Sequence, residues 1–299
     1  MALSETIRNL RTTQVVTSVD SMRRLRQQAN GSSVGLVPTM GYLHEGHLSL
    51  VRRARQENKF VIASIFVNPI QFGPNEDFER YPRDTQRDLQ LLQQENVDVV
   101  FMPPASDMYP EGFDTYLDVG RVTEVLEGAC RPGHFRGVAT AVLKLFNVVQ
   151  PTRAYFGQKD AQQLVVIRKL VNDLNVPVEV VGCPTVRETG GLAMSSRNVY
   201  LSPNERRAAL VLFRSLSLSE RLFRTGERDA NKLRDRIKLL VSREPLAKVD
   251  YISIADPETL QELEVMQSPT LLSLAIRVGD TRLIDNLTLG EKHPAPVFD

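Results

Sequence analysis

The chain has 299 residues, of which 42% are hydrophobic, and a formal net charge of +1. This length suffices for two compact domains or one large one, and the near-neutral charge offers no general attraction for nucleic acid or a membrane surface. No apolar run is long enough to cross a bilayer, and the first residues lack the apolar stretch of a secretory signal peptide. The cysteines, Cys130 and Cys183, show no pairing pattern. We therefore expect a cytoplasmic protein, with nucleic acid and membranes excluded as partners.

Apolar runs alternate with amphipathic stretches through the first two-thirds of the chain. The runs predict strands at residues 34–39, 60–67, 97–103, 153–157 and 177–184. The stretches between them predict helices at residues 46–58, 85–96, 137–150 and 160–174. Strands that alternate with helices predict an α/β fold, here a Rossmann-like parallel sheet with helices on both faces. Such sheets bind ligands beyond the carboxyl ends of their strands.

The pattern changes near residue 185, so we predict one domain at residues 1–185 and a second at residues 186–299. In the second, Ser202 as N-cap and Glu205 at N3 form a capping box that opens a long helix, with Pro203 at N1. The remaining predicted elements are the rest of that helix to residue 223, a helix at 229–244, strands at 248–256, 271–279 and 282–289, and a loosely held tail at 291–299. Helices followed by strands indicate a smaller C-terminal α+β domain.

The segment VPTMGYLHEGHLSLV places two of the four histidines, His44 and His47, beside Gly41 and Gly46, between a predicted strand and a predicted helix. The first N–H groups of a helix lack internal partners, and the helix dipole adds roughly half a positive charge there. Glycines let a ligand lie close against the backbone. Together these features predict a cradle for a polyphosphate.

Two other interpretations of the histidines are open. Zinc proteases need H-E-x-x-H, whereas this chain has H-E-G-H without an evident cluster of further ligands, which disfavours a metal site. Both rings could also be ordinary half-buried histidines. This interpretation explains less well why two of the four histidines in the chain lie beside two glycines. The chain has neither the G-x-x-x-x-G-K-[ST] nor the G-x-G-x-x-G signature of other nucleotide folds.

The H-x-G-H form is similar to the first signature of the nucleotidylyltransferase and class I tRNA-synthetase superfamily. MSSRN, at residues 194–198, resembles the second signature, K-M-S-K-S, although Ala193 stands where the first lysine would be. Between them lie FVNPIQFGPNEDFERYPRD, LEGACRPGHFRGVATAV and YFGQKDAQQLVVIRKLV. In this order, over residues 34–289, these segments resemble the pantothenate synthetase (pantoate–β-alanine ligase) family.

The resemblance implies a two-step reaction. The carboxylate of pantoate attacks the α-phosphorus of ATP, giving pantoyl adenylate and pyrophosphate. The amine of β-alanine then attacks the acyl carbon, releasing pantothenate and AMP. The implied partners are ATP with Mg²⁺, pantoate and β-alanine, and the family implies a homodimer.

The resemblance also implies the site residues. His47, His44, Lys159 and Arg197 would be catalytic. ATP would be bound by Met40, Gly41, Tyr42, Leu43, His44, Glu45, Gly46, His47, Gly157, Gln158, Lys159, Asp160, Val186, Met194, Ser195, Ser196 and Arg197. Gln71 and Gln163 would bind pantoate, with Gln71 also contacting β-alanine, while Asn68, Tyr81 and Arg131 would line the pocket. Asp88 is a candidate contact for Mg²⁺.

These residue types suit the chemistry. A carboxylate nucleophile is already ionised at neutral pH, so the first step needs alignment and stabilisation of phosphate charge rather than a general base. Lys159, beside Gly157 at a predicted helix start, and Arg197 can both hold phosphate oxygens, although a lone lysine is more often a solvated surface group. Asp160 falls at or near the N-cap of that helix, or would instead hold the ribose. We find no convincing base for the β-alanine amine.

The sequence leaves three rival functions open. A simple adenylyltransferase would stop after nucleotide transfer, but Gln71 and Gln163 argue against it. A tRNA synthetase would need a basic RNA-reading surface, which a nearly neutral chain does not suggest. A nucleotide-binding module without catalysis would be expected to lack some of the four cationic or imidazole groups. We expect the C-terminal domain to act as a lid, with a movable loop near Ser195 at the joint.

Overall fold

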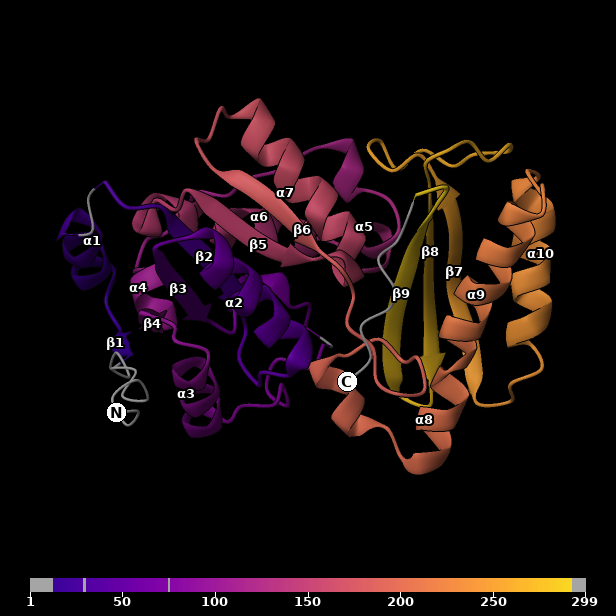
Figure 1. The fold of residues 1–299 in the computed structure, drawn as a ribbon, viewed down its shortest axis with the longest axis horizontal. Coiled ribbons are helices and arrows are strands. Elements are labelled where there is room, and N and C mark those ends of the chain that lie inside the picture. Colours follow the sequence, from indigo (N-terminus) through magenta and orange to yellow (C-terminus); the bar gives the residue numbers. More distant parts are fainter. Residues whose placement is uncertain (1–12, 29–30, 75, 292–299) are drawn as a thin grey trace, which may run out of the picture.

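The computed structural model describes residues 13–28, 31–74 and 76–291 and contains two sheets, each with its own helices (Figure 1). The larger sheet has six parallel strands in the order β1-β4-β3-β2-β5-β6. In that order the strands are Gln14–Val16, Val99–Phe101, Phe60–Ile65, Val34–Thr39, Arg153–Gly157 and Glu179–Cys183. Five of the six were predicted from their apolar runs. The three-residue edge strand β1 was not.

Side chains alternate between the two faces of this sheet, and both faces are covered. Leu36 and Ile62 enter the core formed with one set of helices, whereas Val37 and Val61 enter the core on the opposite side. The first set is α1 (Val19–Gln28), α6 (His134–Val149) and α7 (Ala161–Asp173), and the second is α2 (Glu45–Glu57) and α3 (Thr85–Gln94). The predicted Rossmann-like arrangement is therefore confirmed.

The order of the strands reverses between β2 and β5. From β2 the chain proceeds outward to β3 and β4, while β5 lies on the other side of β2 and leads to β6. Loops that follow two adjacent strands at such a reversal diverge and leave a crevice at the carboxyl edge. The segment with His44 and His47 follows β2, and η3 (Gln158–Asp160) follows β5, so both border this crevice.

The smaller sheet consists of three antiparallel strands, β7 (Ala247–Ala255), β8 (Thr270–Val278) and β9 (Thr281–Leu289). Its apolar face packs against α9 (Val211–Arg224) and α10 (Ala230–Val241). The predicted capping box is present at the start of α8 (Pro203–Ala209). The predicted long helix is divided at Leu210 into α8 and α9. The remaining short elements, η1 (Pro69–Gln71), α4 (Ala105–Met108), η2 (Arg121–Thr123), α5 (Glu127–Cys130) and η4 (Ser196–Tyr200), lie in the connections.

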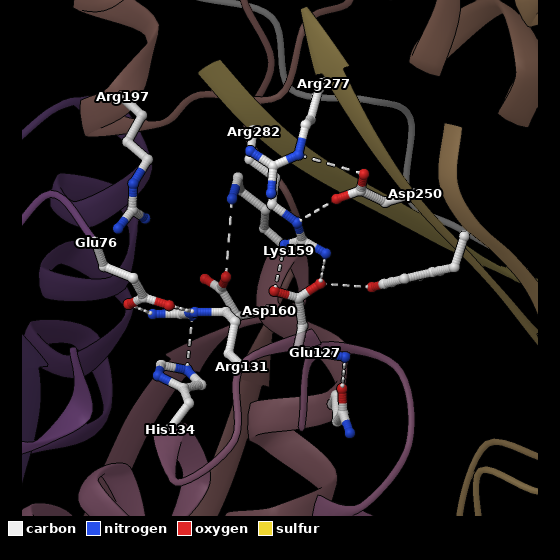
Figure 2. A network of polar contacts seen from close by, with 12 residues as sticks. Glu76, Glu127, Arg131, His134, Lys159, Asp160, Arg197, Asp250, Arg277 and Arg282 are labelled. Carbon is white, nitrogen blue, oxygen red and sulfur yellow. Dashed lines mark hydrogen bonds and ion pairs between the residues drawn. The ribbon is translucent and has the colours of Figure 1, made fainter. Parts of the chain in front are cut away.

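Polar contacts join the smaller sheet to the larger one. Glu127 of α5 is buried and accepts hydrogen bonds from Arg282 of β9, at 2.6 and 2.8 Å, and from the hydroxyl of Tyr251, at 2.9 Å. Asp250 also accepts from Arg282, at 2.7 Å, so this arginine is held from both sides (Figure 2). Strand β9 thus lies against the larger part of the molecule.

A buried ion pair connects the segment after β6 with β9. The guanidinium of Arg187 donates to both carboxylate oxygens of Asp285, at 2.6 and 3.0 Å. The two side chains are only 7% and 1% exposed. Arg187 also donates to the carbonyl of Gly191, at 3.1 Å, in the turn that precedes Met194. This pair therefore fixes the approach to one of the predicted ATP segments.

The predicted division at residues 185 and 186 falls in the connection between β6 and η4 and remains a prediction. Within residues 13–28, 31–74 and 76–291, no helix has the length and apolar character needed to cross a membrane. The predicted loose tail lies outside the described residues except for Glu291.

The Asp285→Ala variant should lose about 3–5 kcal/mol of unfolding free energy, because it leaves the Arg187 guanidinium buried without its counter-charge. Urea denaturation measures this loss. Asp173→Ala is the control, since Asp173 forms an exposed pair with Lys169 and should cost less than about 1 kcal/mol. Equal losses in the two variants would contradict the role given to the buried pair.

Candidate active site

Asp88 holds the loop that follows β2. Its carboxylate accepts hydrogen bonds from the backbone N–H groups of Tyr42 and Leu43, each at 2.7 Å, and its side chain is 2% exposed. Gly41 has a φ of +82°, and a Cβ atom there would lie 3.0 Å from Asp88 Oδ2. A glycine is needed at this point because the turn requires a positive φ beside a carboxylate.

His44 and His47 form a pair at the start of α2. His44 is the N-cap residue, and its backbone N–H donates to Nδ1 of His47 at 3.3 Å. A neutral His47 ring that accepts at Nδ1 carries its proton on Nε2. The two ring centroids are 4.0 Å apart, and a Cβ atom on Gly46 would lie 2.9 Å from the His44 ring. The glycine therefore leaves room for the His44 ring beside that of His47.

The surroundings of both imidazoles favour the neutral ring at pH 7. Burial, with a contribution from the neighbouring His47, lowers the pKa of His44 to about 2. Burial also lowers the pKa of His47 to about 4, with Asp160 raising it and Lys159 lowering it. A neutral His47 can still donate a hydrogen bond from Nε2. A bound polyanion would raise both pKa values, since nearby negative charge favours the protonated ring.

Lys159 lies in the turn η3, directly after β5. Its ammonium group is 3.7 Å from Asp160 Oδ1, and its side chain is 19% exposed. Asp160 takes the predicted N-cap position of α7, but its side chain makes no capping hydrogen bond. The predicted position is therefore confirmed, although the carboxylate faces Lys159 rather than the backbone N–H groups of the helix (Figure 2).

Arg197 reaches the site from η4. Its guanidinium donates from Nε and Nη2 to the two carboxylate oxygens of Asp77, both at 2.8 Å. Ser195 caps the backbone N–H of Arg197 at 3.3 Å, and the hydroxyl of Ser196 donates to the carbonyl of Tyr42, also at 3.3 Å. The last contact joins the predicted second signature to the loop of the first.

These segments surround one cavity of about 240 Å³. The predicted residues that line it are Met40, His44, Gly46, His47, Asn68, Gln71, Tyr81, Arg131, Gly157, Lys159, Asp160, Gln163, Val186, Met194, Ser195, Ser196 and Arg197. The four groups predicted to be catalytic thus converge on a single space, together with both predicted pantoate residues. Their individual roles stay predictions.

Some of the predicted residues do not line this cavity. Gly41, Tyr42, Leu43, Glu45 and Gln158 are absent from the described lining. Glu45 is paired with Arg52 of the same helix.

Gln71 is held in place by several polar contacts. Its Oε1 accepts from Asn68 Nδ2 at 2.9 Å, and its Nε2 donates to Met40 Sδ at 3.2 Å. Asn68 is oriented in turn by the hydroxyl of Tyr109, which donates to Oδ1 at 2.7 Å. A Cβ atom on Gly137 would lie 2.4 Å from the Ile70 carbonyl, so only glycine lets α6 approach Gln71 this closely.

A second polar cluster fixes the backbone of Gln71. Arg131 donates to both oxygens of Glu76, at 2.6 and 2.7 Å, and lies 3.0 Å from His134 Nε2 (Figure 2). Because arginine can only donate, His134 Nε2 is the acceptor and Nδ1 carries the proton. That proton is donated to the carbonyl of Gln71 at 2.9 Å. His134 is therefore a neutral positioning residue.

Sequence reasoning missed Glu76, Asp77 and His134. The three lie inside segments that had indicated the family, but no periodicity or spacing distinguishes them from solvated polar residues. Only the folded chain shows that Asp77 faces Arg197 and that Glu76 faces Arg131.

Comparison with known proteins gives a consistent result. Residues 14–288 match the family model described as pantoate-beta-alanine ligase. The chain is 61% identical over 275 residues to pantothenate synthetase of Roseiflexus castenholzii. The aligned residues cover 92% of this chain and 99% of that protein.

Two solved structures are also similar. The crystal structure of pantothenate synthetase from Thermus thermophilus has a TM-score of 0.88 and 51% identity, covering 92% of this chain and 99% of that one. That of pantoate-beta-alanine ligase from Francisella tularensis, complexed with beta-gamma ATP and beta-alanine, has a TM-score of 0.76 and 34% identity, covering 95% and 100%.

The His134 ring should titrate near pH 4, because burial and the adjacent Arg131 lower its pKa to about 4. Imidazole ¹⁵N shifts should show an Nδ1–H tautomer that persists at pH 5. In the unfolded chain the ring binds its second proton near pH 6.5. As the pH falls from about 6.5 to 4, His134 therefore lowers the free energy of unfolding. A midpoint near 6.5 in the folded protein would overturn this assignment.

Proposed function

The chain belongs to the pantoate–β-alanine ligase family, and we propose that its central cavity carries out the ATP-dependent condensation of pantoate with β-alanine. The observation that carries this proposal is the convergence of His44, His47, Lys159 and Arg197 on one space. Gln71 lines the same space, so polyphosphate-binding groups and a neutral amide suited to a hydroxy acid lie within reach of one another.

In the first step, a pantoate carboxylate oxygen forms a bond to the α-phosphorus of ATP while the bond to the pyrophosphate oxygen breaks. His47 Nε2–H, the Lys159 ammonium and the Arg197 guanidinium donate to the phosphate oxygens that gain charge. Asp77 takes one N–H from Nε and one from Nη2, so the Nη1 group of Arg197 can donate to a phosphate while this contact is kept. Aligned donors of this kind stabilise the transition state without a proton transfer from the nucleophile.

The ATP contacts divide among three segments. We propose that residues 40–47 and 157–160 provide backbone and side-chain contacts from the carboxyl ends of β2 and β5. Residues 194–197 approach from the other side, with Val186 as a further backbone contact. The hydrogen bond from Ser196 to Tyr42 supports this arrangement, because it already links the first and third segments.

In the second step, the neutral amine of β-alanine attacks the acyl carbon of pantoyl adenylate. The new C–N bond replaces the bond between that carbon and the phosphate oxygen, AMP leaves, and the amine releases one proton. Gln71 and Gln163 would hold pantoate, and Gln71 would also contact β-alanine. The fixed amide of Gln71 supports this, since its contacts with Asn68 and Met40 set the orientation of both side-chain atoms.

We propose that Mg²⁺ enters with ATP and is held mainly by the phosphates, supplying positive charge that offsets theirs. Among the described residues, no group of three or more His, Cys, Asp or Glu side chains could hold a metal ion. Asp88, the predicted Mg²⁺ contact, is buried, and both of its oxygens already accept backbone N–H groups. We therefore favour a role for Asp88 in holding the loop after β2.

We further propose a cytoplasmic homodimer in which residues 186–299 close over the site. Family membership supports the dimer. The lid is supported by Ser195, Ser196 and Arg197, which line the cavity from the C-terminal side. Closing the site would limit hydrolysis of the reactive adenylate.

The purified protein should exchange labelled pyrophosphate into ATP only when pantoate is present, and should release AMP when β-alanine is added. His47→Asn should lower the exchange rate about 10²–10³-fold, because it retains an acceptor near the His44 N–H but removes the Nε2–H donor. Lys169→Ala, on the exposed face of α7, is the control and should exchange at the normal rate.

Each rival function predicts a different result in this assay. Pantoate-dependent exchange without release of AMP when β-alanine is added would indicate a simple adenylyltransferase. ATP binding without any exchange would indicate a regulatory module. Either result would refute the proposed condensation.

Asp88→Asn should raise KM for ATP about 10- to 100-fold, because an amide N–H₂ would face one of the backbone N–H groups that Asp88 now accepts. Steady-state kinetics at several Mg²⁺ concentrations measures this effect. Asp84→Asn is the matched control, since Asp84 caps α3 and asparagine caps equally well. Recovery of the normal KM at high Mg²⁺ would show instead that Asp88 contacts the ion.

A further inference from the structure

The turn that carries Lys159 is held from outside by the smaller sheet. Asn286 of β9 donates from Nδ2 to the carbonyl of Gln158, at 2.9 Å, and to the carbonyl of Lys159, at 2.7 Å. We propose that Asn286 is a positioning residue for Lys159, which rests on the proposed function of Lys159 in holding phosphate oxygens. Asn286 does not line the central cavity, so it acts through the turn.

The strand geometry explains how β9 reaches this turn. Successive side chains on a strand point to opposite faces, so residues 282, 284 and 286 share one face and residues 283 and 285 share the other. Arg282, on the first face, contacts Glu127 of the larger part of the molecule. Asn286 lies on that same face and meets η3.

The neighbouring residue makes the matching contact on the other face. Asp285 is paired with Arg187, at the base of the turn that leads to Met194 and Arg197. It also accepts the backbone N–H of Asn286 at 2.9 Å. Two adjacent residues of β9 therefore hold the approach to both predicted cationic ATP segments.

The chemistry of the contact requires a primary amide. The Nδ2 group has two N–H donors, and two successive carbonyl oxygens accept from it. Alanine would leave both carbonyls without this partner, and aspartate would present an acceptor to two acceptors. Either substitution of Asn286 would therefore disturb the backbone of the turn that carries Lys159.

Lys159 depends on its backbone for its position. Its ammonium group approaches Asp160 at 3.7 Å, which is too long to be a good hydrogen bond and so holds the side chain only weakly. A shift of about 1 Å in a group that aligns reacting phosphates can cost about 10²-fold in rate. The position of the Lys159 ammonium group thus depends on a fixed backbone in this turn.

Asn286→Ala should lower kcat for pantoate-dependent pyrophosphate exchange about 10- to 100-fold, with KM for pantoate changed by less than about twofold. Asn286→Asp should be no more active than Asn286→Ala. Tyr251→Phe is the matched control, because it removes one contact between the sheets, with Glu127, without touching the turn. It should retain normal kcat. Thermal unfolding of each variant confirms that the protein remains folded.

A double-mutant cycle with Lys159→Ala separates positioning from general docking of the sheets. If Asn286 acts through Lys159, adding Asn286→Ala to Lys159→Ala should change the residual rate by less than about twofold. The same 10- to 100-fold loss on both backgrounds would overturn the proposal, as would a normal kcat for Asn286→Ala. Absence of exchange in the unmodified protein would instead refute the proposed function itself.

Discussion

The pairing of β2 with β5 is the constraint on which the site depends. Gly35 lies opposite Arg153 and Leu36 opposite Ala154 in a parallel register. Two segments that are distant in sequence therefore end side by side, one leading to the histidine pair and the other to Lys159. The reversal of strand order at this point leaves the crevice that they border. Without this pairing, the imidazoles and the ammonium group would belong to unrelated surfaces.

Three cations of the site each lie beside a carboxylate. Arg197 contacts Asp77, Arg131 contacts Glu76, and Lys159 lies near Asp160. These carboxylates keep several positive groups from repelling one another around one cavity. Asp77 uses only Nε and Nη2 of Arg197, so the Nη1 group keeps donors for an arriving anion.

Sequence reasoning predicted the elements with strong periodicity and missed those without it. The strand FVIASI, buried on both faces, and the capped start of α8 were evident, because hydrophobic patterning and capping are local properties. Strand β1 is three residues long and carries too little pattern to be identified. The division of the predicted helix at Leu210 likewise could not be predicted, because no glycine or proline lies at that point.

The residues of the site likewise fall into those that the sequence predicts and those that it does not. The histidines, Lys159 and Arg197 could be predicted because they lie in recognisable segments. Asp77, His134 and Asn286 could not, since each acquires its importance from a partner far along the chain. An asparagine on a strand gives no sign that both of its donors will meet the turn before α7. Partners of this kind are set by tertiary structure.

The most direct measurement is a crystal structure of the protein with pantoate and a non-hydrolysable ATP analogue. We predict that His47 Nε2, Lys159 Nζ and the Arg197 guanidinium will each lie within about 3.2 Å of a phosphate oxygen. A nucleotide bound with its phosphates away from these three groups would contradict the account.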